Sequence, residues 1–361
     1  MKSSYRAMQI TSPGVLELVE RPTPAPGIGQ VLIEVEACGI CGADVGDIEG
    51  VDPAQQPPRV PGHEVVGRIA MLGEHVPSIW KVGQRVGVGR LGGSCGECAQ
   101  CRQGLFQLCP NQHFVGASCD GGYAEVMLAR ASGLVSIPDE LDAEQAAPIL
   151  CAGIATFNAL KKSGAQAGDT VAILGIGGLG HMALQYARRM GFRVVAVGRG
   201  SDIAADAKAL GAHIYIDTHE QDAALELKAL GGVQAIVTTV GAPAAVSPLL
   251  AGLAPQGCLV LLGAGKDPLP VSTGNLVVGE RRVLGSITGS PYESEKTLDF
   301  SVLAGVRPQI EVMPFEQANE AYQRMKSGDA KFRIVLAIGS RKKTTSPSTG
   351  EDNKDMSPQT P

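Results

Sequence analysis

The spacing of apolar and polar positions changes along the chain and separates a β-rich part from an α/β part. Residues 6–35 alternate apolar and polar side chains between Pro and Gly residues, and residues 60–90 continue the same alternation. A period of two is typical of half-buried strands, so we expect a β-rich unit here. An Ala-rich pattern with helical spacing follows over residues 142–162.

From Asp169 onward the pattern becomes strand, glycine loop, helix, strand. The predicted elements are a strand at Thr170–Leu174, a loop at Gly175–Gly180, a helix at Met182–Met190, a strand at Arg193–Val197, and buried strands at Ala235–Thr239 and Cys258–Leu262. Apolar runs of this kind occur in parallel sheets covered by helices on both faces. This part is therefore predicted to be a doubly wound α/β unit.

The last part of the chain resembles the first. Residues 309–336 read as β-rich again, so we infer that the chain returns to complete its first domain. Residues 340–361 are rich in Ser, Thr, Pro, Lys and Asp without apolar anchors, and they are predicted to be disordered. At 361 residues the chain exceeds the usual size of one domain, so two domains are expected.

Composition and charge exclude several classes of function. The net charge of −5 and the absence of a basic cluster before the tail argue against nucleic-acid binding. The sequence contains no run of about 18 apolar residues, so no membrane span is predicted. The N-terminus leads into no apolar segment of a secretory signal. Nine cysteines in such a chain indicate reduced thiols used for metal binding or chemistry, and we expect a cytoplasmic protein.

Four cysteines form the most specific motif, Cys95-x2-Cys98-x2-Cys101-x7-Cys109. Thiolates at this spacing, separated by Gly, Glu and Gln, suit a loop that closes tetrahedrally on zinc. The alternative is a chance cluster of reduced, buried cysteines, which the polar composition of the segment disfavours. Four protein ligands leave no open position, so this zinc is predicted to be structural.

A second set of candidate ligands is dispersed along the chain. Cys41 and Asp44 lie in Cys-Gly-Ile-Cys-Gly-Ala-Asp, His63 and Glu64 in Pro-Gly-His-Glu, and Cys151 follows the Ala-rich helical stretch. Each alone is more often a packed core residue, and the first two cysteines of the motif also read as half of a zinc knuckle or as a redox pair. Two thiolates and one imidazole together leave an open zinc position for a substrate oxygen.

A glycine loop, Gly175-Ile-Gly177-Gly178-Leu179-Gly180, follows the strand predicted at 170–174 and opens a helix. In that setting the glycines permit a tight turn and bring a pyrophosphate to the helix N-terminus, where free N–H groups favour anions. The alternative is a glycine-rich turn without a ligand. The strand about twenty residues further on favours a dinucleotide-binding site.

These motifs, in this order, resemble the zinc-containing alcohol dehydrogenases of the medium-chain dehydrogenase/reductase superfamily, and the likeness covers about residues 6–338. The resemblance implies an α/β fold, in which a Rossmann domain at 153–295 joins a chaperonin-10-like (GroES-like) catalytic domain at 1–152 and 296–339, followed by a tail at 340–361. It implies a homodimer or homotetramer. It also implies catalytic zinc on Cys41, His63 and Cys151.

The resemblance assigns further residues around that zinc. Glu64 matches a carboxylate near the metal, and Asp44 matches a partner that holds His63 in its ligating tautomer. A plain turn or cap is the alternative for Asp44. Arg333 resembles an arginine near the cofactor pyrophosphate, with an exposed strand charge as the alternative. Ala43 departs from the family, because many members carry a Ser or Thr there that relays the substrate proton.

The residues at the end of the strand predicted at Arg193–Val197, the second strand of the α/β unit, indicate which cofactor binds. A carboxylate there would hydrogen-bond the ribose 2′-hydroxyl and repel a 2′-phosphate. Gly198 occupies that position, and Arg199 and Ser201 can contact a phosphate instead, so we expect NADP(H) rather than NAD(H). Asp202 is the opposing feature, since it can repel the phosphate or cap the next helix.

The predicted activity is hydride transfer between NADP(H) and an alcohol or aldehyde, with zinc stabilising the oxygen on which charge develops. The missing hydroxyl at Ala43 keeps open a reductase of enal or iminium substrates. A non-catalytic NADPH-binding relative is a further alternative, although complete ligand sets at both zinc sites argue against it. The substrate itself is not predicted.

Overall fold

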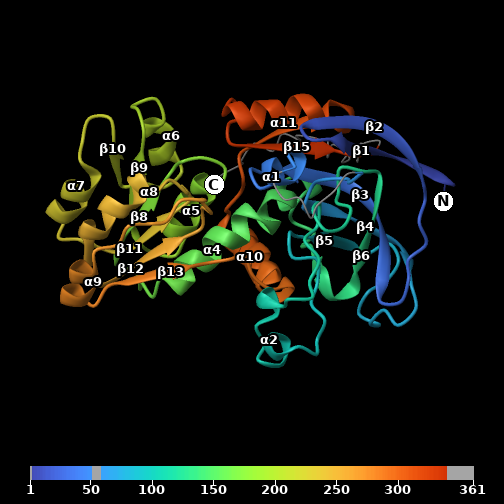
Figure 1. Cartoon of the computed structure of the whole chain (residues 1–361), viewed down its shortest axis with the longest axis horizontal. Coiled ribbons are helices and arrows are strands. Elements are labelled where there is room, and N and C mark those ends of the chain that lie inside the picture. Colours follow the sequence, from blue (N-terminus) through green and yellow to red (C-terminus); the bar gives the residue numbers. More distant parts are fainter. Residues whose placement is uncertain (1, 51–57, 340–361) are drawn as a thin grey trace, which may run out of the picture.

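The computed structural model describes residues 2–50 and 58–339, which form two lobes, each built around its own β-sheet (Figure 1). The lobe at the left of Figure 1 contains the middle of the chain, and the lobe at the right contains both the first and the last of the described residues. No helix among the described residues is long and apolar enough to cross a membrane. The tail at 340–361, predicted to be disordered, lies outside the described residues.

The left lobe is a six-stranded parallel sheet. Its strands are β8 (Thr170–Leu174), β9 (Arg193–Gly198), β10 (Ile214–Asp217), β11 (Val233–Thr238), β12 (Leu253–Leu261) and β13 (Arg282–Gly285). They lie in the order β10-β9-β8-β11-β12-β13. Helices α5 (Gly180–Arg189), α6 (Ala204–Ala209), α7 (Ala223–Ala229), α8 (Pro243–Val246) and α9 (Thr273–Gly279) connect and cover these strands (Figure 1).

Both faces of this sheet are buried, as the apolar runs in the sequence predict. Val171 and Ile173 of β8 belong to one hydrophobic cluster, whereas Ala172 and Leu174 belong to another. Because successive side chains of a strand point to opposite faces, the two clusters lie on opposite sides of the sheet. The predicted doubly wound, Rossmann-like unit is therefore confirmed.

The right lobe is β-rich, as predicted. A hairpin of β1 (Ser4–Ser12) and β2 (Val15–Pro22) lies beside a seven-stranded sheet made of β3 (Gln30–Ile40), β4 (Glu64–Leu72), β5 (Arg85–Val88), β6 (Val126–Arg130), β7 (Leu134–Ser136), β14 (Ile310–Pro314) and β15 (Arg333–Ala337). The order is β14-β15-β3-β4-β5-β7, and β6 also pairs with β3. Since β15 runs antiparallel to β3, the chain returns to this lobe after the parallel sheet.

Two sequence expectations are met only in outline. The helical pattern over residues 142–162 corresponds to three consecutive elements, α3 (Ala143–Ala146), a 3-10 turn at Ala147–Leu150 and α4 (Ala152–Lys162). Pro148 at the start of the turn lacks a backbone N–H, and Cys151 leaves the helical region with φ −129° and ψ −74°. Residues 309–336 are also not purely β, because α11 (Ala318–Ser327) lies between β14 and β15.

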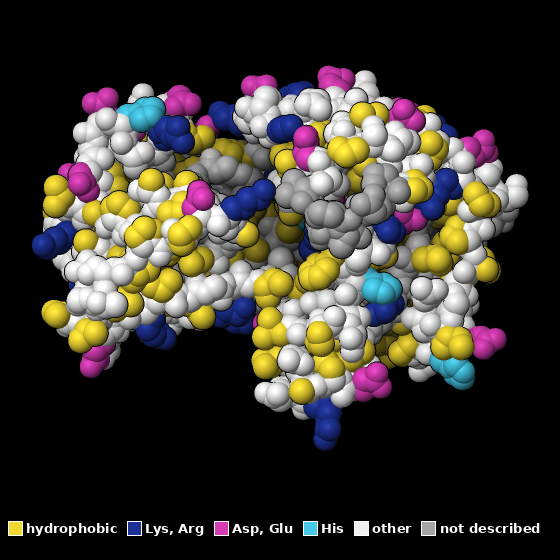
Figure 2. Space-filling view, in the orientation of Figure 1, with side chains coloured by type: hydrophobic (Ala, Val, Ile, Leu, Met, Phe, Trp, Pro, Cys, Tyr) yellow, Lys and Arg dark blue, Asp and Glu magenta, His cyan; other side chains and the backbone are white. Residues whose placement is uncertain are grey.

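Three further helices mark the edges of the lobes. Helix α1 (Asp44–Ile48) follows β3, and α2 (Ala99–Arg102) lies in a small projection at the bottom of Figure 1. Helix α10 (Pro291–Ala304) lies with α4 at the junction of the lobes (Figure 1), and the domain boundary predicted at 295/296 falls inside it. Charged side chains of both signs are scattered over the face shown in Figure 2 and form no single basic patch there.

Candidate active site and metal centres

The dispersed candidate ligands come together at one end of the right lobe's sheet. Cys41 follows β3, the His63–Glu64 pair begins β4, and Cys151 precedes α4. One ligand atom from each of the four residues lies within 4.8 Å of the others, and the two sulfurs are 3.8 Å apart. Strands β3 and β4 are antiparallel, with Gly39 opposite Glu64, which places Cys41 and His63 at the same end of the sheet.

The chemistry of this cluster fits zinc. Nε2 of His63 is buried and has no hydrogen-bond partner among the described residues, an arrangement that costs free energy unless the nitrogen binds a ligand. The Cys151 thiol hydrogen-bonds to Cys41 and lowers the pKa of Cys41 well below its usual range. This shift favours the thiolate form of Cys41, which is the form that binds metal. These residues hold the catalytic zinc site.

A buried carboxylate fixes the imidazole. Oδ1 of Asp44 lies 2.8 Å from Nδ1 of His63, which leaves Nε2 directed at the cluster. Oδ2 accepts a hydrogen bond from the backbone N–H of Cys41 at 2.9 Å. Asp44 thus has the geometry of a partner for the histidine and also that of a local turn residue, so its two sequence readings do not exclude each other.

Tyr123 completes this network, although no sequence motif indicates it. Its hydroxyl donates to Oδ2 of Asp44 at 2.9 Å, and the whole side chain is buried. Its ring packs on Gly62, where a Cβ would lie 2.3 Å from the ring and where φ is +95°. Tyr123 lies sixty residues after His63 and belongs to no metal-binding motif. Its contact with Asp44 is therefore visible only in the folded structure.

Arg333 connects the zinc cluster with the glycine loop. It is 4% exposed and forms a buried ion pair with Glu64, so it is not an exposed strand charge. A Cβ built on Gly178 would lie 2.8 Å from its Nη1. Burial raises the pKa of Glu64 to about 7, and the Arg333 charge opposes this rise.

The four-cysteine motif forms the second metal site, in the projection that carries α2. The sulfurs of Cys95 and Cys109 are 3.6 Å apart, and those of Cys98 and Cys109 are 3.9 Å apart. All four ligand atoms lie within 4.8 Å of one another. The side-chain amide of Asn111 donates to Cys95 and lowers the pKa of that thiol to about 6. Four sulfurs at these distances fit a closed structural zinc site.

The glycine loop joins β8 to α5. Gly175 has φ +89°, and a Cβ at Gly180 would lie 1.9 Å from the Gly175 carbonyl oxygen, so both glycines are required by the backbone. Nothing lies within 4 Å of a Cβ built on Gly177, which leaves open space beside the loop. Leu179 occupies the N-cap position of α5. The loop thus leaves room for a phosphate group at a helix N-terminus, where anions are favoured.

A cavity of about 500 Å³ extends from this loop along the ends of the parallel strands. Gly198 and Arg199 line it, whereas Ser201 and Asp202 do not. Asp222 also lines it, but its carboxylate caps α7 by accepting from the N–H of Ala224. The cavity walls further include Ile176, Ile203, Thr218, Val240 and Pro248.

A carboxylate at the end of β10 was missed by the sequence analysis. Oδ1 of Asp217 accepts from the N–H of Gly200 at 2.8 Å and from the N–H of His219 at 2.9 Å. In the sheet register Asp217 pairs with Gly198, so this side chain holds the loop that carries Arg199. It does not line the cavity described above.

A parallel dinucleotide-type sheet beside a cluster of zinc ligands defines a zinc-dependent dehydrogenase. Residues 27–139 match the family described as alcohol dehydrogenase GroES-like domain, and residues 178–302 match zinc-binding dehydrogenase. The alcohol dehydrogenase notN of Aspergillus sp. (strain MF297-2) is 41% identical over 90% of this chain and 94% of its own length. The alcohol dehydrogenase of Geobacillus stearothermophilus is 40% identical over 90% and 96%.

The chain therefore belongs to the zinc-binding medium-chain alcohol dehydrogenase family. It is an alcohol dehydrogenase, an oxidoreductase that acts on CH–OH donors with NAD or NADP.

Solved structures agree with this assignment. The crystal structure of AibC superimposes with a TM-score of 0.88 at 31% identity over 94% of this chain and 97% of that chain. The cofactors in such structures differ. The protein CAD from Helicobacter pylori is complexed with NADP(H) (28% identity, 94% and 99% coverage, TM-score 0.82), and an acetophenone reductase from Geotrichum candidum is in complex with NAD (27%, 93% and 98%, 0.82).

Proposed function

We propose that the protein transfers hydride between NADP(H) and an alcohol or carbonyl substrate, with zinc on Cys41, His63 and Cys151. The unsatisfied Nε2 of His63 within the buried cluster carries this proposal. When bound, zinc acts as a Lewis acid toward the substrate oxygen, and the nicotinamide carries the hydride. Asp44 keeps the proton of His63 on Nδ1, and Glu64 stays paired with Arg333 beside the glycine loop.

The preference for NADP(H) rests on Arg199. It is exposed, it lines the cavity at the end of β9, and Gly198 stands where a ribose-binding carboxylate is expected. The carboxylate of Asp222 in the same cavity is engaged at the N-terminus of α7. Ser201 and Asp202 lie outside the lining, so we assign neither of them a dominant role.

Steady-state kinetics with NADPH and NADH test this preference. We expect a higher kcat/KM with NADPH, and Arg199→Gln to raise KM for NADPH about 10- to 100-fold, because a charge-assisted hydrogen bond contributes about 1.5–3 kcal/mol. KM for NADH should stay unchanged. Arg193→Gln, at the opposite end of β9, is the matched control. An NADH preference in the unmodified enzyme, or equal effects of both variants, would contradict the assignment.

A second candidate activity is reduction of enal or iminium substrates, and Ala43 motivates it. Ala43 precedes α1 and offers no side-chain hydrogen bond, so the proton relay of many relatives has no hydroxyl here. A panel of simple aldehydes, enals and iminium compounds with NADPH discriminates the two. Turnover of simple aldehydes supports the first proposal, and turnover of enals or iminium compounds alone would replace it.

We also propose a homodimer or homotetramer. Strand β13 ends the six-stranded sheet, and next to it Val277 and Val278 of α9 are 76% and 89% exposed. An open sheet edge beside apolar side chains favours association with another copy. Light scattering at micromolar concentration tests this, and a monomer would contradict it.

We further propose the domain division given by the two sheets, with a catalytic domain at 1–152 and 296–339 and a nucleotide-binding domain at 153–295. The pairing of β15 with β3 supports it. We propose a cytoplasmic location, and none of the nine cysteines forms a disulfide, which supports a reducing compartment. Limited proteolysis tests the division, because the nucleotide-binding unit should resist cleavage as one fragment.

A further inference from the structure

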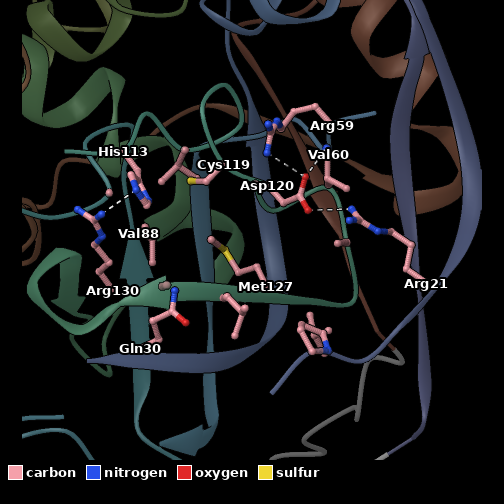
Figure 3. Close-up of a pocket in the computed structure, with 18 of the residues that line it drawn as sticks. Arg21, Gln30, Arg59, Val60, Val88, His113, Cys119, Asp120, Met127 and Arg130 are labelled. Atoms are coloured by element: carbon pink, nitrogen blue, oxygen red, sulfur yellow. Dashed lines mark hydrogen bonds and ion pairs between the residues drawn. The ribbon is translucent and has the colours of Figure 1, made fainter. Parts of the chain in front are cut away.

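A second cavity, of about 510 Å³, lies in the β-rich lobe (Figure 3). Its walls come from the end of β2, from β6 and from the loop that precedes β6, and none of the zinc ligands lines it. No residue of the glycine loop or of the 500 Å³ cavity beside it lines this space. Figure 3 shows charged side chains at its two ends and apolar side chains between them.

One end of the cavity holds two arginines and one carboxylate. Nη1 of Arg21 lies 2.9 Å from Oδ2 of Asp120, and Nη1 of Arg59 lies 3.7 Å from Oδ1. That Oδ1 also accepts from the N–H of Val60 at 3.0 Å. Two guanidiniums share a single carboxylate, so among residues 2–50 and 58–339 this end has one positive charge more than its ion pairs neutralise. Nε of Arg59 is buried and has no hydrogen-bond partner among residues 2–50 and 58–339.

The other end holds Arg130. Its guanidinium donates to the carbonyl oxygen of Asn111 at 2.9 Å and lies 2.7 Å from Nε2 of His113. Burial and the Arg130 charge lower the pKa of His113, so the imidazole is neutral near pH 7 and accepts this hydrogen bond. No salt bridge of Arg130 occurs within the described part of the chain, and this end also carries one positive charge.

The wall between the two ends is mostly apolar. Val88, Met127 and Cys119 lie between the charged groups in Figure 3. The side chains of Arg21, Arg59 and Asp120 are 30%, 29% and 34% exposed, so a solute can reach the cavity. A ligand complementary to this surface has an apolar middle and an anionic group at each end.

We propose that this cavity binds an α,ω-dicarboxylate, with one carboxylate at Arg130 and the other at Arg59 and Arg21. Charge-assisted, bidentate pairing is the strongest hydrogen bonding that a guanidinium makes with an oxyanion. A compact anion such as inorganic phosphate occupies one end only. A monocarboxylate likewise satisfies one arginine end and leaves the other unpaired.

Calorimetric titration of the zinc-replete enzyme, with its cofactor site saturated, tests the proposal. The probes are malonate, succinate, glutarate and adipate, with butyrate and inorganic phosphate for comparison. We expect saturable binding of at least one dicarboxylate with a Kd of about 1 mM or below, and at least about tenfold weaker binding of butyrate and phosphate. No saturable dicarboxylate binding, or tighter binding of phosphate, would overturn the proposal.

Variants at each end separate the cavity from other anion sites. Arg130→Gln and Arg59→Gln should each weaken binding of the preferred dicarboxylate about tenfold and leave butyrate little changed. Arg193→Gln, on the other lobe, is the matched control and should change nothing. Each end of the cavity has its own variant, so if one variant misfolds the other still tests the proposal. Retained turnover shows which variants are folded. Dicarboxylate binding that neither folded variant weakens would refute this site.

Discussion

Removal of one buried hydroxyl tests whether the network behind His63 supports the metal. In Tyr123→Phe, Asp44 loses the hydrogen bond from the Tyr123 hydroxyl at its Oδ2 but keeps the one from the Cys41 N–H and the 2.8 Å contact with Nδ1 of His63. A hydrogen bond to a charged group contributes about 1.5–3 kcal/mol, so we expect this loss of folding free energy in the zinc-loaded protein. Loss of a partner outside the ligand shell typically weakens metal binding about 10- to 100-fold. We expect the lower limit, because the Cys41 N–H hydrogen bond and the contact with the imidazole remain.

The control for Tyr123→Phe is Tyr186→Phe. Tyr186 is also fully buried, and its hydroxyl makes one hydrogen bond, to Ser301 at 2.7 Å, in the other lobe. This variant should lose about 0.5–1.5 kcal/mol without any change in zinc affinity. Chelator competition measures the affinity, and urea unfolding measures the stability. If both variants retain the same zinc affinity, Tyr123 is only a packing residue and the reasoning is refuted.

Four further predictions concern metal, proton transfer and pH. Cys41→Ala should abolish turnover yet leave NADPH binding largely intact, as fluorescence titration can check; activity in a zinc-depleted sample would contradict the zinc assignment. Cys98→Ser should lower the unfolding temperature and halve the zinc content, while the soluble fraction still binds zinc at the other site. Ala43→Ser should raise kcat for alcohol oxidation about tenfold if the missing hydroxyl limits proton transfer, and unchanged kcat would show another route. Burial lowers the pKa of His181 to about 3, so the neutral imidazole stabilises the fold above pH 6.5 and this contribution is lost as the pH falls below that value. Between pH 7 and 5.5 the loss is about 1 kcal/mol, and urea unfolding should show it absent in His181→Gln.

The sequence predicts those parts of the fold that depend on local pattern. Buried strands such as β8 and β11 are apolar runs in the sequence, and the glycine loop predicts the turn that follows β8. Each of these patterns is contained in a short segment of the chain. The four-cysteine site is equally local. Its ligands fall within one short segment, and their spacing alone predicts that they meet.

Structural features that depend on contacts between distant segments cannot be predicted from such local patterns. Helix α11 has buried residues at Ala318, Ala321 and Tyr322, which is a helical spacing. Short apolar segments on either side of this helix make the spacing difficult to recognise in the sequence. The residues adjacent to Tyr123 and Asp217 in the sequence form no motif that indicates a functional role. Each gains its role only because strands or loops far apart in sequence place a carboxylate beside a particular hydroxyl or N–H group.

The return of the chain to its first lobe explains why the active site needs the last strand. Strand β15 pairs with β3 next to the segment that carries Cys41, and its first residue, Arg333, is buried between Glu64 and Gly178. Removing one partner of a buried ion pair costs about 3–5 kcal/mol, because the remaining charge stays in an apolar environment. The glycine loop therefore lies against a side chain that is ion-paired to Glu64 of the zinc cluster and that belongs to neither motif. Hydride transfer requires the cofactor and the metal at one place, and Arg333 is a buried side chain that lies beside both the zinc cluster and the glycine loop.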